Sequence, residues 1–243
     1  RDKPEVVINC AAWTDVDSCE TDSDRAYSSN ARGPENLATA SRQLNAALIT
    51  ISTDYVFDGS KSGFYTQRDH PNPQSVYAAS KRDGELRAQI AHAGAIVVRT
   101  GYVFGPGGKN FLSTIVKRAR AGQTLMAISD AFGTPTYSLD LAKRLRELAL
   151  QNLPGVYHVV NSGEGVSFDE FAQETLKVAG CSDVAIERVS MASLKRPAPR
   201  PRNSRLKCLL SEAIGLAPMP NWRDAIVEFV QRERESNSVE AVR

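Results

Sequence analysis

Cysteine and histidine are scarce in this chain of 243 residues, which contains only four cysteines and three histidines. The cysteines form no C-x-x-C pair, and the histidines His70, His92 and His158 are widely spaced. This spacing argues against a zinc site, so we expect no bound metal. Scattered cysteines without such a pattern are typical of reduced thiols, which predicts a cytoplasmic protein.

Long apolar runs and a strong excess of one charge are also lacking. No hydrophobic stretch approaches the roughly 18 residues that a membrane-spanning helix requires, so we expect no membrane insertion. Thirty Lys and Arg residues stand against 28 Asp and Glu residues, which gives a net charge of +2. Such a small charge creates no long-range field that would gather nucleic acid. The hydrophobic content of 42% is sufficient for one large domain, or for a core domain with a smaller appendage.

Short apolar runs alternate with longer amphipathic stretches along most of the chain. The predicted strands are Val6–Cys10, Ala47–Ser52, Ile96–Thr100, Leu125–Ile128 and Gly155–Val160. Between them, amphipathic patterns predict helices over residues 24–45, 77–91, 110–121 and 138–150. This alternation is typical of an α/β fold in which helices cover both faces of a parallel sheet.

The last third of the chain has a different pattern. A capping box over residues 167–170 predicts a helix that ends near Gly180. A short strand is expected over residues 184–189, and a last helix begins near Trp222. Three alternate prolines forbid a regular helix over residues 196–204, so we expect an extended loop there.

Tyr77 and Lys81 are four residues apart at the start of a predicted helix, so their side chains share one helix face. A free phenol ionises near pH ~10, and a neighbouring ammonium group favours the phenolate. Tyr77 is therefore a candidate general acid. Thr53 follows a buried strand, at the sheet edge where ligands bind in open parallel sheets. Its hydroxyl either polarises a substrate carbonyl or caps the loop backbone.

Several motifs occur together and in a fixed order. They are Asn9-Cys-Ala-Ala12, Ser52-Thr-Asp-Tyr-Val-Phe-Asp-Gly59, Tyr77-x-x-x-Lys81, Arg99-Thr-Gly-Tyr-Val-Phe-Gly105 and Gly108-Lys-Asn-Phe111. Together they resemble the extended short-chain dehydrogenase/reductase family, and within it the dTDP-4-dehydrorhamnose reductases are the most similar branch. The resemblance implies a Rossmann-like doubly wound parallel sheet, N-terminally incomplete, with a smaller C-terminal substrate-binding α/β subdomain. It assigns residues 1–101 and 138–160 to the core and residues 102–137 and 161–243 to the subdomain.

The resemblance also implies roles for individual residues. Tyr77 would protonate the C4 oxygen of a keto sugar, Lys81 would lower the phenol pKa and hold the nicotinamide ribose, and Thr53 would polarise the same carbonyl. The remaining implied binding residues are Ala11, Ala12 and Trp13 for the dinucleotide and Asp54, Tyr102 and Arg200 for the nucleotide sugar. The cofactor would be NADPH or NADH, the substrate a dTDP-linked 4-keto-6-deoxysugar, and a homodimer is allowed. Tyr102 departs from the Trp that is usual at its position, although an aromatic face is retained.

A glycine-rich phosphate turn is missing. The chain contains no G-x-x-G-x-x-G, which the family places between its first strand and first helix to bind the cofactor pyrophosphate. We therefore expect that an N-terminal segment is absent, that residues 6–10 form an exposed apolar strand edge, and that the chain binds dinucleotide poorly. Residues 105–109 lack the spacing of a Walker loop and are expected to form a loop before a helix.

Other interpretations stay open at this stage. An epimerase or dehydratase would share the fold, but dehydratases follow the strand-end Thr with Asp-Glu, whereas this chain has Asp54-Tyr55. A non-catalytic regulatory subunit, like that of methionine adenosyltransferase, is a further alternative. The acidic residues between 15 and 24 form either a solvent-exposed segment that leads into a helix or a metal site. The arginines at 196, 200, 202 and 205 either meet a substrate diphosphate or serve surface solubility.

Overall fold

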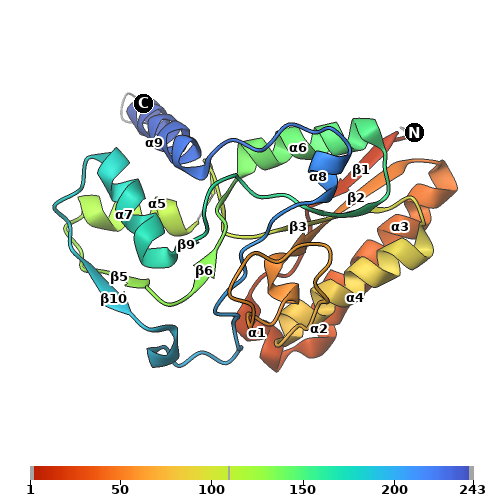
Figure 1. The fold of residues 1–243 in the computed structure, drawn as a ribbon, viewed down its shortest axis with the longest axis horizontal. Helices are drawn as coiled ribbons and strands as arrows, with labels where there is room; N and C mark the ends of the chain where they lie inside the picture. Colours follow the sequence, from red (N-terminus) through yellow and green to blue (C-terminus); the bar gives the residue numbers. More distant parts are fainter. Residues whose placement is uncertain (1–2, 109, 241–243) are drawn as a thin grey trace.

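A parallel sheet lies at the centre of the molecule (Figure 1). The computed structural model describes residues 3–108 and 110–240. The four strands of the sheet are β1 (Val6–Asn9), β2 (Ala47–Thr53), β3 (Ile96–Thr100) and β8 (Gly155–His158), in the order β1-β2-β3-β8. All three pairings are parallel, which confirms the predicted fold class.

Helices cover both faces of this sheet. They are α3 (Gly33–Leu44) and α4 (Val76–Ala91) on one face and α6 (Ser138–Gln151) on the other. Successive residues of β2 point to opposite faces, because side chains alternate along a strand. Leu48 packs with Ala38 and Ala88, whereas its neighbour Ile49 packs in the cluster that contains Leu145. The sheet is therefore buried on both sides, as a doubly wound fold requires.

The helix predicted over residues 24–45 is broken. It consists of α2 (Ser23–Tyr27), a π-helical turn (Ser28–Arg32) and α3, and it is preceded by a separate helix α1 (Val16–Thr21). Pro34 has no N–H to donate to the carbonyl of Asn30, so the regular α-helical ladder cannot continue through this point. Helix α4 crosses the turn at Gly84, where any Cβ would clash with the Asn30 carbonyl oxygen.

A second group of elements packs beside the sheet. Strand β5 (Leu125–Ile128) pairs in parallel with β10 (Ile186–Val189), and α5 (Phe111–Arg120), α7 (Phe168–Ala179) and α9 (Trp222–Glu240) accompany them. The strand predicted at Leu125–Ile128 thus exists but lies outside the central sheet. These elements share a buried hydrophobic core that includes the aromatic residues Phe104, Phe171, Trp222 and Phe229. The domain limits given above stay a prediction.

Short elements complete the chain. They are strands β4 (Val103–Phe104), β6 (Phe132–Gly133), β7 (Thr136–Tyr137) and β9 (Val166–Ser167), helix α8 (Leu210–Ala213), and the 3₁₀ turns Asp54–Val56 and Met191–Ser193. The capping box of α7 is confirmed, since the Ser167 hydroxyl accepts from the Glu170 N–H. Gly180 ends that helix with φ of 76°.

Strand β1 lies at one edge of the four-stranded sheet, with Val6 and Ile8 exposed to 38% and 42%. Residues 105–108 form a loop before α5, whose N-cap is Asn110, and Lys109 of this motif lies outside the described residues. The same holds for the ends of the predicted domains, residues 1–2 and 241–243. No helix within residues 3–108 and 110–240 combines the length and apolar character needed to cross a bilayer.

Candidate active site

Thr53, Tyr77 and Lys81 line one cavity of about 350 Å³. Thr53 ends strand β2, and the other two side chains come from the first two turns of α4, whose N-cap is Ser75. Ala12, Asp54 and Tyr102 are in the wall of the same cavity. The carboxyl ends of β1, β2 and β3 thus meet around this space, where an open parallel sheet binds its ligands.

The Tyr77 phenol lies in a largely buried environment. The residue is 9% exposed, and the Tyr55 ring meets it edge-on with centroids 6.2 Å apart. Burial raises the pKa of Tyr77 far above its usual value, and a hydrogen bond with the Thr53 side chain opposes this shift only in part. The net shift of the phenol pKa is therefore upward, and the lowering by Lys81 that the resemblance implied does not outweigh burial. At neutral pH the phenol carries its proton.

Lys81 is fixed by the strand below it. Its Nζ donates to the carbonyl of Ile51 over 2.7 Å, and the residue is only 5% exposed. Burial lowers the pKa of Lys81 to about 8, while the charge of Glu85 acts in the opposite direction. The ammonium form therefore predominates at neutral pH, with two of its three N–H donors left for other partners.

A buried charge network supports this part of α4. Glu85, one turn after Lys81, accepts from Arg99 Nε over 2.8 Å and from Arg99 Nη2 over 2.7 Å. It also accepts from the Ser52 hydroxyl over 2.5 Å and from Arg82 Nη1 over 2.6 Å. Glu85 and Arg99 are almost completely buried, and the network ties α4 to the ends of β2 and β3.

Asp54 presents a buried carboxylate to the cavity. Its Oδ1 accepts from the Thr53 hydroxyl over 3.1 Å, whereas Oδ2 is buried and lacks a hydrogen-bond partner among the described residues. Burial raises the pKa of Asp54 to about 6, and the hydroxyls of Ser204 and Thr53 oppose the shift. Gly101 leaves the room for this carboxylate, because a Cβ there would clash with Oδ2.

Tyr102 separates this cavity from a second one. Its backbone has φ of 46°, in the left-handed region that side chains rarely adopt, and its ring stacks on Phe168 with centroids 4.2 Å apart. The second cavity has a volume of about 260 Å³. Both cavities share Tyr55, Tyr102 and Phe168, so an aromatic wall lies between them. Gly133 allows the Tyr102 ring to lie where it does, since a Cβ would clash with that ring.

The second cavity holds two of the four arginines noted in the sequence, Arg196 and Arg200. Arg200 forms a two-pronged ion pair with Asp17, with Nη1–Oδ1 of 3.0 Å and Nη2–Oδ2 of 2.8 Å. Arg205 instead faces Asn203 and the carbonyl of Ser62. The proline-rich loop is therefore divided between the cavity wall and structural contacts.

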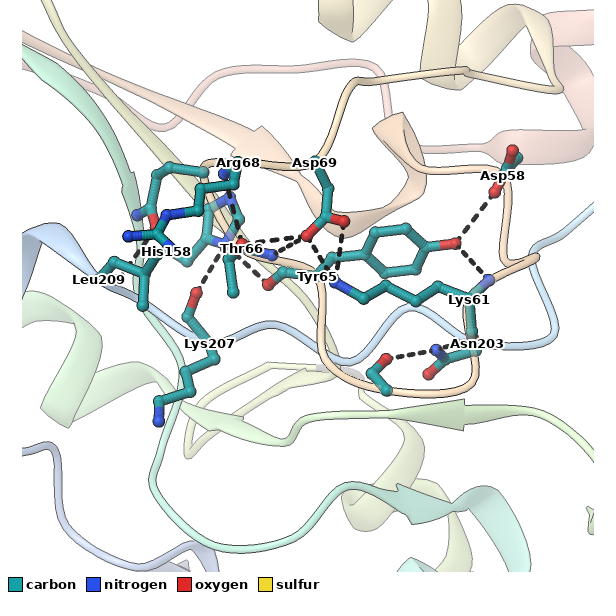
Figure 2. Close-up of polar contacts among 12 residues, drawn as sticks. Asp58, Lys61, Tyr65, Thr66, Arg68, Asp69, His158, Asn203, Lys207 and Leu209 are labelled. Atoms are coloured by element: carbon teal, nitrogen blue, oxygen red, sulfur yellow. Dashed lines mark hydrogen bonds and ion pairs between the residues drawn. The ribbon is translucent and has the colours of Figure 1, made fainter.

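The loop after Thr53 is fastened to the segment 203–209 (Figure 2). The Tyr65 hydroxyl donates to Asp58, and the backbone N–H of Tyr65 donates to the Arg205 carbonyl over 2.7 Å. His158 Nδ1 lies 3.0 Å from the carbonyl of Lys207. Burial lowers the pKa of His158 to about 4, so its imidazole is neutral. His158 is the last residue of β8 and is buried.

The three residues expected to line the dinucleotide differ in their positions. Ala12 is in the cavity wall, whereas Ala11 is exposed and its N–H donates to Asn9 Oδ1. The backbone N–H of Trp13 donates to Asn30 Oδ1 over 2.8 Å, and the Arg25 guanidinium carbon lies 4.5 Å from the centroid of the Trp13 ring. Of the three, only Ala12 is among the residues that line the cavity shared by Thr53, Tyr77 and Lys81.

The acidic run serves as helix caps and anchors. Asp15 is the N-cap of α1 and Asp22 is the N-cap of α2. Glu20 accepts from the Val76 N–H over 2.8 Å, next to the start of α4, and Asp17 holds Arg200. The sequence did not indicate the partners of Asp17 and Glu20, because those partners are far away in the chain.

Comparison with known proteins agrees with this geometry. The family described as RmlD substrate binding domain matches residues 1–235. The chain belongs to this RmlD family. Among curated relatives, a dTDP-4-dehydrorhamnose reductase of Streptomyces griseus is 38% identical over 233 residues, covering 93% of this chain and 76% of that protein. A spore coat polysaccharide biosynthesis protein of Bacillus subtilis is 38% identical, over 96% of this chain and 81% of its own.

The solved structures include another reductase of this kind. The dTDP-4-dehydrorhamnose reductase of Bacillus anthracis, solved in complex with NADP, superposes with a TM-score of 0.91 at 34% identity. The match covers 95% of this chain and 81% of that one. RmlD family membership thus confirms the resemblance that the motifs indicated, and the extent of the match includes both cavities.

Proposed function

We propose that this RmlD family member is an oxidoreductase that uses NADPH or NADH to reduce the C4 keto group of dTDP-4-dehydrorhamnose to dTDP-L-rhamnose. The observation that carries the proposal is the shared cavity of Thr53, Tyr77 and Lys81. It places a neutral phenol, a hydroxyl and an ammonium group around a space large enough for a reacting carbonyl. The relatives named as reductases of this sugar supply the substrate class.

The cavity lined by Thr53, Tyr77 and Lys81, which we call the reaction cavity, fits the nicotinamide end of such a cofactor. Ala12 is small, and Lys81 has two N–H donors left after its bond to Ile51, which suits the paired hydroxyls of a ribose. When bound, the reduced nicotinamide supplies the hydride. NADPH is the first cofactor to test, because the Bacillus anthracis relative was solved with NADP.

The protein supplies the proton and holds the carbonyl. Tyr77 is protonated at neutral pH, so its phenol can donate to the C4 oxygen as negative charge develops there. The Thr53 hydroxyl, which interacts with Tyr77, polarises the same oxygen when its proton turns from Asp54 Oδ1 to the substrate. The ammonium group of Lys81 stabilises the phenolate that remains after proton transfer.

The second cavity would receive the nucleotide part of the substrate. Tyr102 and Phe168 offer aromatic faces, and Arg196 and Arg200 offer positive charge for a diphosphate. Asp54 would accept from a sugar hydroxyl through its unpartnered Oδ2. We further propose that residues 102–137 and 161–243 act as the substrate-binding part, that the enzyme works in the cytoplasm, and that it forms a homodimer.

The position after Asp54 favours reduction over water loss. It holds Tyr55, whose pKa burial raises to about 12, where a dehydratase has a carboxylate. A buried neutral phenol at this place cannot serve as the base that removes a proton from the sugar ring.

Replacement of Tyr77 by Phe tests the proposal. The proton donor is lost while the ring and its packing remain, so kcat for oxidation of NADPH with dTDP-4-dehydrorhamnose should fall by about 10² to 10⁴. Tyr27→Phe is the matched control, since Tyr27 is 37% exposed on α2 and should leave kcat unchanged. Turnover within about ten-fold of the native rate in Tyr77→Phe would rule out proton donation by this phenol.

The same assay addresses the regulatory alternative. A protein that binds both dTDP and NADPH, as measured by calorimetry, but never oxidises NADPH with the keto sugar present would be a non-catalytic member of the family. The reductase proposal requires turnover by native protein that binds both dTDP and NADPH.

A further inference from the structure

The carboxylate of Asp17 fixes the first part of the proline-rich loop, residues 196–204, whereas the end of the loop is held by backbone hydrogen bonds to Phe132. Asp17 accepts from the backbone N–H of Ala198 over 3.1 Å and from the Arg200 guanidinium over 3.0 and 2.8 Å. Asp17 lies in the first turn of α1, directly after Val16, which lines the reaction cavity. The contact therefore joins the wall of one cavity to the wall of the other.

The loop needs such an anchor because of its composition. Pro197, Pro199 and Pro201 have no N–H, so this stretch cannot be fixed by a ladder of backbone hydrogen bonds. The N–H of Ala198 is one of the few that remain, and it is directed to Asp17. The side chain of Arg200 is only 13% exposed, which shows that the guanidinium is packed in place.

The donors of Arg200 are divided between structure and cavity. Its Nη1 donates to Asp17 and to the carbonyl of Ala198, and its Nη2 donates to Asp17. A guanidinium has five N–H donors, so two remain for a ligand in the cavity that Arg200 lines. Arg196, two residues before Ala198, lines the same cavity and has no hydrogen bond or ion pair with any residue of 3–108 or 110–240.

We propose that Asp17 is a positioning residue for nucleotide-sugar binding, because it fixes Arg200 and the segment that carries Arg196 in the wall of the second cavity. This inference rests on the proposed function, since it takes the ligand of the second cavity to be the dTDP part of the substrate. Asp17 itself is not among the residues that line either cavity. Its effect passes through the two arginines.

Titration of dTDP into the full chain, followed by calorimetry, tests this directly and needs no turnover. Asp17→Asn keeps the size but loses the charge, and Asp17→Ala loses every bond. Removing a charge-assisted pair of this kind should weaken dTDP binding by about ten-fold in the Asn variant and more in the Ala variant. Asp24→Asn removes the same charge from α2, where the side chain forms no hydrogen bond or ion pair with the loop in the part of the chain that the structure describes, and this variant should bind dTDP as the native protein does.

A double-mutant cycle separates positioning from simple stabilisation. If Asp17 acts through Arg200, then Asp17→Asn combined with Arg200→Gln should weaken dTDP binding little more than Arg200→Gln alone. Asp17→Glu should restore most of the affinity because the ion pair can re-form. In turnover assays the Asp17 variants should show a raised KM for the sugar, with kcat and the KM for NADPH within about two-fold of native.

Three results would overturn the inference. They are native dTDP affinity in Asp17→Asn, equal weakening in Asp24→Asn, and purely additive effects in the cycle. If Asp17→Ala does not fold, as judged by circular dichroism, the Asn and Glu variants decide. If the native chain binds both dTDP and NADPH but never oxidises NADPH with the keto sugar present, the reductase proposal fails while the positioning role of Asp17 is still tested by affinity.

Discussion

Replacement of Glu85 by Gln should destabilise the protein strongly at neutral pH. The carboxylate is 1% exposed and receives four hydrogen bonds, two of them from an arginine that is itself 3% exposed. Glutamine has the same shape but offers one acceptor oxygen and two N–H donors. Those donors would face the N–H groups of Arg99, which leaves a buried guanidinium without a charge partner.

The size of the effect follows from that loss. Breaking a buried ion pair by removing one partner costs about 3 to 5 kcal/mol of unfolding free energy. Arg82 is 26% exposed and can turn to solvent, so it adds little to this cost. The matched control is Asp83→Asn on the same helix, where the pair with Arg87 is 29% and 41% exposed. An exposed pair of this kind contributes only about 0.3 to 0.5 kcal/mol.

The pH dependence supplies a second check. Burial acts to raise the pKa of Glu85, but the pairing with Arg99 outweighs burial, so this pKa lies below its ordinary value of 4.5. A lowered carboxyl pKa contributes stability that is present above the unfolded-state pKa and is lost as the pH falls through the folded-state pKa. The difference between native protein and Glu85→Gln should therefore shrink on acidification below about pH 4.

Urea unfolding of the native protein and both variants, at neutral pH and in acid, measures these differences. A loss below about 1 kcal/mol for Glu85→Gln at neutral pH would refute the view that Arg99 depends on this carboxylate. So would a loss that stays constant on acidification.

The pKa values of two further buried groups give predictions of opposite sign. For His158, burial lowers the pKa from 6.5 to about 4, so the unfolded state binds a proton that the folded state does not. The free energy of unfolding should therefore fall by up to about 3 kcal/mol as the pH decreases from 6.5 to 4. His158→Gln should flatten this part of the curve of unfolding free energy against pH, and an unchanged slope would contradict the lowered pKa of His158. For Asp54, burial raises the pKa from 3.8 to about 6, so its stability contribution is complete below pH 3.8 and is lost as the pH rises through 6. Asp54→Asn should thus be more stable than the native protein near pH ~8, by at most about 3 kcal/mol, but not near pH ~3.5, while dTDP-sugar affinity falls. Thermal melts at both pH values test this, and equal gains at both would be inconsistent with the buried charge.

Local patterns were sufficient for much of the fold. The period of apolar residues predicted the four strands of the sheet, and the capping box at Ser167 predicted α7, because both signals depend on neighbours in the sequence. The spacing of Tyr77 and Lys81 likewise predicted a shared helix face. The association of Thr53 with both residues followed from the rule that parallel strands end at one edge of a sheet.

Contacts between distant segments were not predictable in this way. The pairing of Asp17 with Arg200 joins residues separated by 183 positions, and neither side chain carries a local signal of the other. Lys81 binds the Ile51 carbonyl, a backbone group that every residue possesses, so the sequence could not single it out. Strand β5 pairs with β10 in a separate sheet, and this pairing depends on which elements pack together. The spacing of apolar residues along the sequence does not define it.

The aromatic wall formed by Tyr55, Tyr102 and Phe168 has a consequence for how such enzymes diverge. The groups that act on the carbonyl come from the strand ends and α4, whereas the opposite side of the wall comes mainly from residues beyond position 110. Mutations in that later part can accumulate without disturbing the proton donor. A change of nucleotide or sugar preference is thereby separable from loss of chemistry, because most residues that line the second cavity lie between positions 126 and 204.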